Sequence, residues 1–297
     1  MNIDVSEGMH YEGFCIRPPS EAFSILLQVT VGCSHNKCTF CGTYKQKRFR
    51  IKEWDVVYSD ILFASKYMKN QNRLFLMDGD ALIIPQRKLV PLIDTINKHL
   101  PWLERIGTYA NAKSLRKKSL DDLIELKQKK LGIVYLGVES GDDEVLREIN
   151  KGATASEYVE LAKKVKQAGI KLSVTVLLGL AGRMRSLEHA RATGELLTKM
   201  DPDYVGALTL MLIPGTPLYE KYENGEFELP DKYGMLLELR EMIRFTDLSN
   251  GLFTSNHASN YLPLKIKYPE GKEGALKLID KALRGEIGLK PEWMRAL

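Results

Sequence analysis

The chain has 297 residues, 44% of them hydrophobic, enough to bury a sizeable core in one large domain or two small ones. Its 43 basic and 38 acidic residues leave a formal net charge of +5, a mild excess that argues against a dedicated nucleic-acid binder. No apolar run approaches membrane-spanning length, and the polar N-terminus lacks the pattern of a signal peptide. With only four cysteines, we expect a cytoplasmic protein whose clustered cysteines bind a metal.

Short apolar runs alternate with helical patterns along the chain. Each run is nearly continuous in apolar residues, as expected of parallel strands that are buried on both faces. The predicted strands are residues 24–30, 74–77, 106–110, 133–138, 172–178 and 204–211. The predicted helices are 53–69, 86–99, one that begins after Ser119, 156–166, 186–199, 236–245 and 272–284. Ser119 and Asp122 have the spacing of a capping box at a helix start.

Six strand–helix units predict an α/β fold, a partial (β/α)6 TIM-like barrel of parallel strands with a short C-terminal α-rich extension. We expect an N-terminal segment over residues 1–21, a core barrel over 22–225, and an extension over 226–297 that packs on the barrel.

Polar or glycine-rich segments follow the C-terminal ends of all the predicted strands. They are the cysteine loop 31–41, residues 78–80, Asn111, and residues 139–141, 179–183 and 213–217. Chemistry collects at these strand ends in folds of this class. The alignment therefore predicts a single active-site rim.

Cys33, Cys38 and Cys41 lie within nine residues on the loop after the first strand. Three cysteines leave one iron of a [4Fe–4S] cluster open to a substrate or cofactor, whereas a structural zinc takes four ligands. Zinc with His35 as fourth ligand is the alternative. The fourth cysteine of the chain, Cys15, is either a radical relay or an ordinary buried thiol. The basic run 45–52 is either a solvated loop or an anion contact beside the metal site.

Three segments together resemble the radical S-adenosylmethionine (radical SAM) superfamily. The cysteine spacing is C-x4-C-x2-C, one residue longer than the commonest family spacing, and Phe40 stands where the family usually has an aromatic residue. Residues 135–146 are similar to the family's fourth-strand segment. Residues 212–219 are similar to the sixth-strand segment of the coproporphyrinogen-oxidase-like and methylthiotransferase-like branches. The resemblance covers roughly residues 22–225.

The resemblance implies an enzyme whose three clustered cysteines hold a [4Fe–4S] cluster that chelates S-adenosylmethionine. Electron transfer from the cluster would break a C–S bond, and the resulting 5′-deoxyadenosyl radical would abstract hydrogen from the substrate. A low-potential electron donor such as flavodoxin or ferredoxin is implied as a partner.

The resemblance also assigns residues to the cofactor by position. Asp78-Gly79-Asp80 stands where the family has glycine-glycine-glutamate, which implies that Gly79 and Asp80 receive the cofactor ammonium and that Asp78 is a substrate-side catalytic acid. A simple turn is the alternative. Glu139 and Ser140 are expected at the ribose or the methionine portion.

Four further positions are assigned in the same way. Arg183 is expected to pair with the cofactor carboxylate, and otherwise is a surface charge. The residues expected beside adenine, which otherwise belong to the core, are Phe40, Leu178 and Ile213.

Two segments, residues 17–22 and 255–261, are candidates for substrate recognition. His257 in the second is a candidate acid or base, with a structural hydrogen bond as the alternative. The leading prediction is a radical SAM enzyme for a small or medium-sized substrate, acting without nucleic acid or membrane. A radical SAM enzyme that modifies RNA is one alternative. A zinc-stabilised binding protein without catalysis is another.

Overall fold

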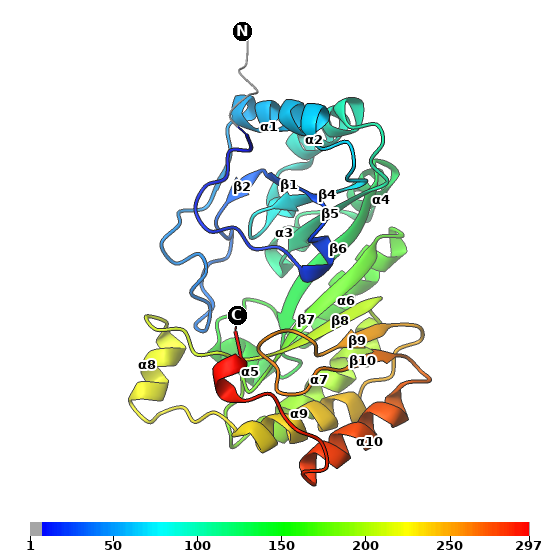
Figure 1. The fold of residues 1–297 in the computed structure, drawn as a ribbon. Helices are drawn as coiled ribbons and strands as arrows, with labels where there is room; N and C mark the ends of the chain where they lie inside the picture. Colours follow the sequence, from blue (N-terminus) through cyan, green and yellow to red (C-terminus); the bar gives the residue numbers. More distant parts are fainter. Residues whose placement is uncertain (1–7, 297) are drawn as a thin grey trace. The chain divides into compact units, whose positions relative to one another are not determined.

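The computed structural model describes residues 8–296, which form two compact units (Figure 1). The first unit comprises the residues up to Asn36, Thr43–Leu136 and Lys164–Lys171. The second comprises Lys37–Gly42, Gly137–Lys163 and the residues from Leu172 onward. Strand β6 (Leu131–Glu139) and helix α6 (Ala155–Gln167) run through the boundary between the two.

The first unit is built on parallel strands in the order β1 (Ile25–Gln28), β4 (Arg73–Met77), β5 (Arg105–Ala110) and β6. The helices between them are α1 (Trp54–Tyr67), α2 (Gln86–His99), α3 (Ala112–Arg116) and α4 (Leu120–Gln128). Strand β2 (Thr30–Val31), at the start of the cysteine loop, pairs antiparallel with β3 (Arg50–Ile51), which lies within the basic run.

Strand β4 shows why these segments fold as interior strands. Four of its five residues are buried, and Leu74 pairs with Ile25 of β1 on one side and Ile106 of β5 on the other. A strand with neighbours on both sides and covered faces favours apolar side chains at its buried positions, which accounts for the apolar run that follows Arg73.

In the second unit, β7 (Lys171–Leu178), β8 (Tyr204–Thr209) and β9 (Leu252–Thr254) are parallel, and β10 (Lys265–Lys267) pairs antiparallel with β9. Helix α7 packs on α9, and α9 packs on α10 (Figure 1). The helices of this unit are α5 (Asp143–Glu148), most of α6, α7 (Ser186–Met200), α8 (Pro217–Glu223), α9 (Lys232–Arg244) and α10 (Lys272–Leu283).

The predicted strands and helices are confirmed, and the α2 bounds agree with the prediction to the residue. Strands β9 and β10 were not predicted. Each has three residues, which is too short for an alternating pattern to be read from sequence. The predicted boundaries at residues 22 and 226 stay a prediction. Among residues 8–296, no helix is both long and apolar enough to cross a membrane.

Candidate functional site

The cysteine loop crosses the boundary between the units: Cys33 belongs to the first, and Cys38 and Cys41 belong to the second. All four cysteines are partly exposed, and none is in a disulfide. Within residues 8–296, no three His, Cys, Asp or Glu side chains form a group that could hold a metal ion. The predicted ligand set therefore stays a prediction.

In the first unit, the residues on both sides of Cys33 are bound to the turn that follows β4. The Gly32 N–H donates to Asp78 Oδ2 over 3.2 Å, and the Ser34 hydroxyl donates to Asp80. Gly79 between the two acids has no room for a side chain, since an added Cβ would lie 2.8 Å from the Tyr44 ring. The Asp78-Gly79-Asp80 turn thus holds the backbone on either side of the first cysteine.

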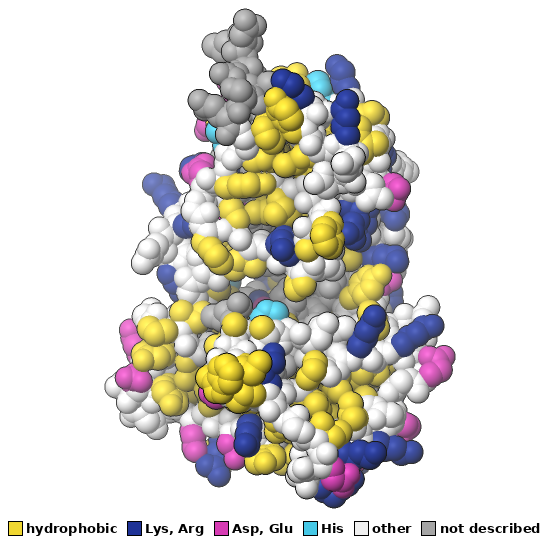
Figure 2. Space-filling view, in the orientation of Figure 1, with side chains coloured by type: hydrophobic (Ala, Val, Ile, Leu, Met, Phe, Trp, Pro, Cys, Tyr) yellow, Lys and Arg dark blue, Asp and Glu magenta, His cyan; other side chains and the backbone are white. Residues whose placement is uncertain are grey.

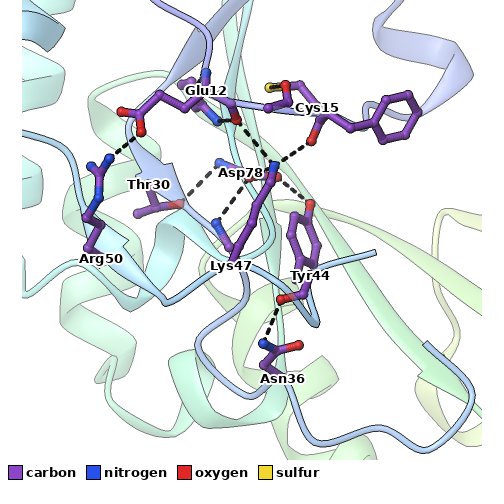
Figure 3. A network of polar contacts seen from close by, with 12 residues as sticks. Glu12, Cys15, Thr30, Asn36, Tyr44, Lys47, Arg50 and Asp78 are labelled. Atoms are coloured by element: carbon purple, nitrogen blue, oxygen red, sulfur yellow. Dashed lines mark hydrogen bonds and ion pairs between the residues drawn. The ribbon is translucent and has the colours of Figure 1, made fainter. Parts of the chain in front are cut away.

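Asp78 is fully buried at the centre of a polar network (Figure 3). The Tyr44 hydroxyl donates to Oδ1, and Lys47 Nζ lies 3.8 Å from Oδ2. Lys47 also donates to the carbonyls of Glu12 (3.2 Å) and Phe14 (2.7 Å), which ties the N-terminal segment to this turn. Burial and Asp78 raise the pKa of Tyr44 well above its ordinary value, so the phenol stays a proton donor. These contacts show Asp78 anchoring the loop, and its predicted catalytic role stays a prediction.

Asp80 differs from Asp78 in keeping one acceptor unused. Its Oδ1 is buried and has no hydrogen-bond partner in the described part of the chain. Burial raises the pKa of Asp80 to about 6, and the hydrogen bond from Ser34 partly opposes this rise. A buried carboxylate oxygen without a donor is costly unless a ligand supplies one. This orphaned oxygen fits the predicted role of Asp80 toward an ammonium group.

In the second unit, the residues around Cys38 and Cys41 are bound to two other segments. The Thr39 N–H donates to the Ile149 carbonyl (3.0 Å), and the Leu218 N–H donates to the Thr39 carbonyl (3.1 Å). Gly42 lies against Ile213, where an added Cβ would be 2.7 Å from Cγ2. Phe40 and Ile213, both predicted beside adenine, are partly exposed on these neighbouring segments.

Glu139 at the end of β6 has the left-handed φ of +71° and accepts from Lys151 Nζ over 2.8 Å. Burial lowers the pKa of Lys151 and Glu139 raises it, with a net rise, so the pair is ionic. An added Cβ at Gly137 would lie 2.4 Å from Glu139 Oε1, so a side chain there would displace the Glu139 carboxylate from its present position. Lys151 was missed by sequence reasoning. The sequence signal that could have indicated it is the position of this lysine shortly after the short helix that follows Glu139.

The hydroxyl of Ser140 forms a hydrogen bond with the buried His189 of α7. Its Oγ lies 2.9 Å from His189 Nδ1, and His189 Nε2 lies 3.0 Å from the Leu177 carbonyl of β7. Glu238 of α9 accepts from the Gly179 N–H (2.7 Å), just past β7. The network therefore links the ends of β6 and β7 to two helices of the same unit, and neither His189 nor Glu238 was singled out from the sequence.

The remaining predicted positions are also in the second unit. Leu178 is buried at the end of β7. The Arg183 side chain is 66% exposed and pairs with Glu228 over 2.7 Å. Its predicted pairing with a cofactor carboxylate stays a prediction. His257 lies on a segment bound to the end of β8.

Residues 27–192 match the family model described as the radical SAM superfamily. The chain belongs to this superfamily. Radical SAM proteins are generally enzymes and normally bind a [4Fe–4S] cluster and S-adenosylmethionine.

Three similar proteins illustrate the breadth of the superfamily. Uncharacterized protein MJ0486 of Methanocaldococcus jannaschii is 26% identical over 281 residues, covering 87% of this chain and 82% of the relative. The tRNA-2-methylthio-N(6)-dimethylallyladenosine synthase of Ehrlichia canis is 28% identical over 162 residues, covering 53% of this chain and 35% of the relative. The structure of coproporphyrinogen III oxidase (HemN) from Escherichia coli has a TM-score of 0.55 at 17% identity, covering 75% of this chain and 51% of that chain.

The structural likeness confirms the fold class, an α/β fold with a mostly parallel sheet that resembles the partial TIM-like barrels of radical SAM proteins. The predicted resemblance to coproporphyrinogen-oxidase-like and methylthiotransferase-like proteins is likewise confirmed. The chain spans about half or less of the length of the two named enzymes.

Proposed function

We propose that this radical SAM protein is an enzyme that holds a [4Fe–4S] cluster on Cys33, Cys38 and Cys41 and acts on a small or medium-sized organic substrate. When bound, the cluster supplies the electron that cleaves S-adenosylmethionine to a 5′-deoxyadenosyl radical, which abstracts hydrogen from the substrate. The observation that carries the proposal is the three-cysteine loop inside the matched segment 27–192.

The donor set of the chain fits these groups. Thiolates are the usual ligands of iron–sulfur clusters, and the thiols of the loop are partly exposed and not in disulfides. Asp80 keeps a buried oxygen without a donor, as a site for an ammonium group requires. Glu139, held by Lys151, retains acceptor capacity for the hydroxyls of a ribose.

Within each unit, other residues fix the segments that carry these groups. Asp78 fixes the Gly32 backbone before the first cysteine, and Tyr44 and Lys47 hold Asp78. Thr39, between the second and third cysteines, is fixed by two backbone hydrogen bonds. Rigid supports of this kind keep reactive groups within the narrow geometry that radical chemistry needs.

The partners belong to the same proposal. We infer a low-potential donor such as flavodoxin or ferredoxin, because a cluster that cleaves a sulfonium must be reduced first. We also infer a cytoplasmic location, because a reducing compartment keeps clustered cysteines available as metal ligands and not as disulfides.

Modification of RNA is the second candidate, favoured by the similarity to the tRNA-2-methylthio-N(6)-dimethylallyladenosine synthase of Ehrlichia canis. The basic run 45–52 supports it only weakly. Lys47 is engaged with the N-terminal segment, Arg50 pairs with Glu12, and the buried Lys52 lies 3.6 Å from Asp60. Three of the five cations in the run are thus held by internal contacts.

The test is anaerobic reconstitution of the full chain, reduction with dithionite and addition of S-adenosylmethionine. We expect a cluster signal in the electron paramagnetic resonance spectrum that S-adenosylmethionine perturbs, and 5′-deoxyadenosine in the chromatogram. Cys38→Ala should abolish both. Cys15→Ala is the matched control and should keep both, because Cys15 lies outside the loop. Stoichiometric zinc without cofactor cleavage would instead support the binding-protein alternative.

A further inference from the structure

The segment from Ser255 to Tyr261 is fixed to the C-terminal end of β8 within the second unit. Asn260 accepts from the Thr209 hydroxyl through Oδ1 (2.8 Å) and donates to the Ala207 carbonyl through Nδ2 (2.9 Å). The Thr209 N–H donates to Ser259 Oγ (3.2 Å). Ser259 and Asn260 are buried. A segment held by three hydrogen bonds to one strand end presents its other side chains in fixed positions.

The ring of His257 on this segment has a defined tautomer. Its Nδ1 accepts the backbone N–H of Ser259 over 3.2 Å and lies 2.9 Å from Ser259 Oγ. A backbone N–H only donates, so Nδ1 must carry a lone pair, and the proton of the neutral ring must be on Nε2. The Nε2–H has no hydrogen-bond partner among residues 8–296. The ring therefore presents a donor, not a base, at the end of β8.

Lys290 adds a positive charge near His257. Its Nζ donates to the carbonyl of Ala258, the residue next to His257, over 3.1 Å. Burial and Lys290 together lower the pKa of His257, which favours the neutral ring. The other nearby cation, Arg295, is committed to Ser259, Tyr261 and Glu292. An ammonium has three donors, so Lys290 keeps capacity for a ligand.

We propose that His257 Nε2–H and Lys290 Nζ form a binding site for an anionic oxygen group of the substrate, a carboxylate or a phosphate. Two N–H donors, one of them charged, match the acceptor oxygens of either group. Parallel α/β folds bind substrates at this end of their strands. The proposal rests on the proposed function only in taking the ligand to be the substrate. The site itself needs neither cluster nor S-adenosylmethionine.

The test uses the full chain labelled with 15N-histidine, with succinate and glycerol phosphate as separate probes and glycerol as the uncharged control. His257 is one of five histidines, and its ring signals are identified by their loss in His257→Gln. We expect the Nε2–H tautomer in the free protein and a saturable shift of the His257 signals with at least one anionic probe. The stronger probe distinguishes a carboxylate from a phosphate ligand.

Matched variants separate a ligand site from a structural role. Isothermal titration calorimetry measures the binding of the probe in the variants, because those without His257 lack its ring signals. His257→Ala and Lys290→Gln should each weaken this binding about tenfold or more, since each removes a donor to a charged group. His257→Gln keeps an N–H donor near the Nε2 position and should bind within a few-fold of wild type. Lys281→Gln, at an exposed position of α10, should bind like wild type.

An Nδ1–H tautomer, or unchanged binding in His257→Ala, would overturn the proposal. Because the titration needs no radical chemistry, its outcome is independent of the reconstitution experiment. Probe binding without cofactor cleavage would sink the proposed function and keep this site. Cofactor cleavage without probe binding would do the reverse.

Discussion

His189 and Glu238 are fully buried in the second unit, with His189 Nε2 3.5 Å from Glu238 Oε1. Burial lowers the pKa of His189 from 6.5 to about 4 and raises that of Glu238 from 4.5 to about 7. Between pH 4 and pH 6.5, the unfolded chain binds a proton on His189 more readily than the folded chain does. His189 therefore makes the stability rise with pH in this range. The folded chain holds the Glu238 proton, so the glutamate makes stability fall as pH rises from about 4.5 to about 7.

Replacing Glu238 and replacing His189 should therefore change the pH dependence of stability in opposite directions. The free energy of unfolding of Glu238→Gln, relative to wild type, should rise by roughly 3 kcal/mol from pH 4.5 to pH 7. That of His189→Gln, relative to wild type, should fall by a similar amount from pH 4 to pH 6.5. Urea unfolding at a series of pH values measures both. If the stabilities of the two variants relative to wild type changed with pH in the same direction, or did not change with pH, His189 and Glu238 would not be neutral in the folded protein.

At this scale, the sequence predicts residues that belong to short motifs and misses those that only the fold brings near. Asp80 was predicted from its neighbours, and the structure gives it an unused acceptor. Glu238 lies 59 residues from Gly179, whose N–H it accepts, so no local spacing could indicate it. The pairing of Arg183 with Glu228, 45 residues further along the chain, could likewise not be read from local spacing.

Helix α4 shows how local chemistry sets an element. The Asp122 N–H donates to Ser119 Oγ (3.0 Å) and the Ser119 N–H donates to Asp122 Oδ2 (2.8 Å), forming the predicted capping box. We expect Ser119→Ala to lower the free energy of unfolding by about 1 kcal/mol, because it leaves a helix N–H without its acceptor. Denaturant unfolding with an unchanged m-value is the measurement.

Ser65→Ala in α1 is the matched control for this substitution. The Ser65 hydroxyl donates to the Leu62 carbonyl inside the helix (2.7 Å), where alanine is the better helix former. Its stability should be unchanged or slightly higher. An equal loss in both variants would show that the capping box contributes nothing specific.

The elements were predictable wherever a pattern extended over enough residues. Helix α2 repeats its apolar positions over 14 residues, and β7 is an eight-residue run rich in apolar and β-branched residues. Strands β9 and β10 lack such a signal, because their placement depends on pairing with β8 and with each other. The C-terminal segment therefore looked mainly helical in sequence although it continues the sheet.

On the scale of the whole molecule, the charge distribution bears on the choice between a small substrate and RNA. The net charge of +5 comes from 43 basic and 38 acidic residues, so most cations have an acidic counterpart. On the face drawn in Figure 2, the Lys and Arg side chains within each unit are dispersed among other side chains. Nucleic-acid binders concentrate their cations along one surface, because binding to phosphates depends on releasing counterions.

We accordingly expect unfractionated tRNA to bind the full chain with a Kd weaker than about 10⁻⁴ M at physiological salt, the weak end of non-specific binding. Fluorescence anisotropy over a range of salt concentrations measures both the affinity and its salt dependence. Micromolar or tighter binding with a steep salt slope would favour the RNA-modifying alternative. In that case Lys45→Ala combined with Arg48→Ala, at two exposed positions of the basic run, should reduce the slope by about 2 if the run contacts phosphates. The pair Lys277→Ala and Lys281→Ala on α10 is the matched control, and it should leave the slope unchanged, because only cations that contact phosphates release counterions.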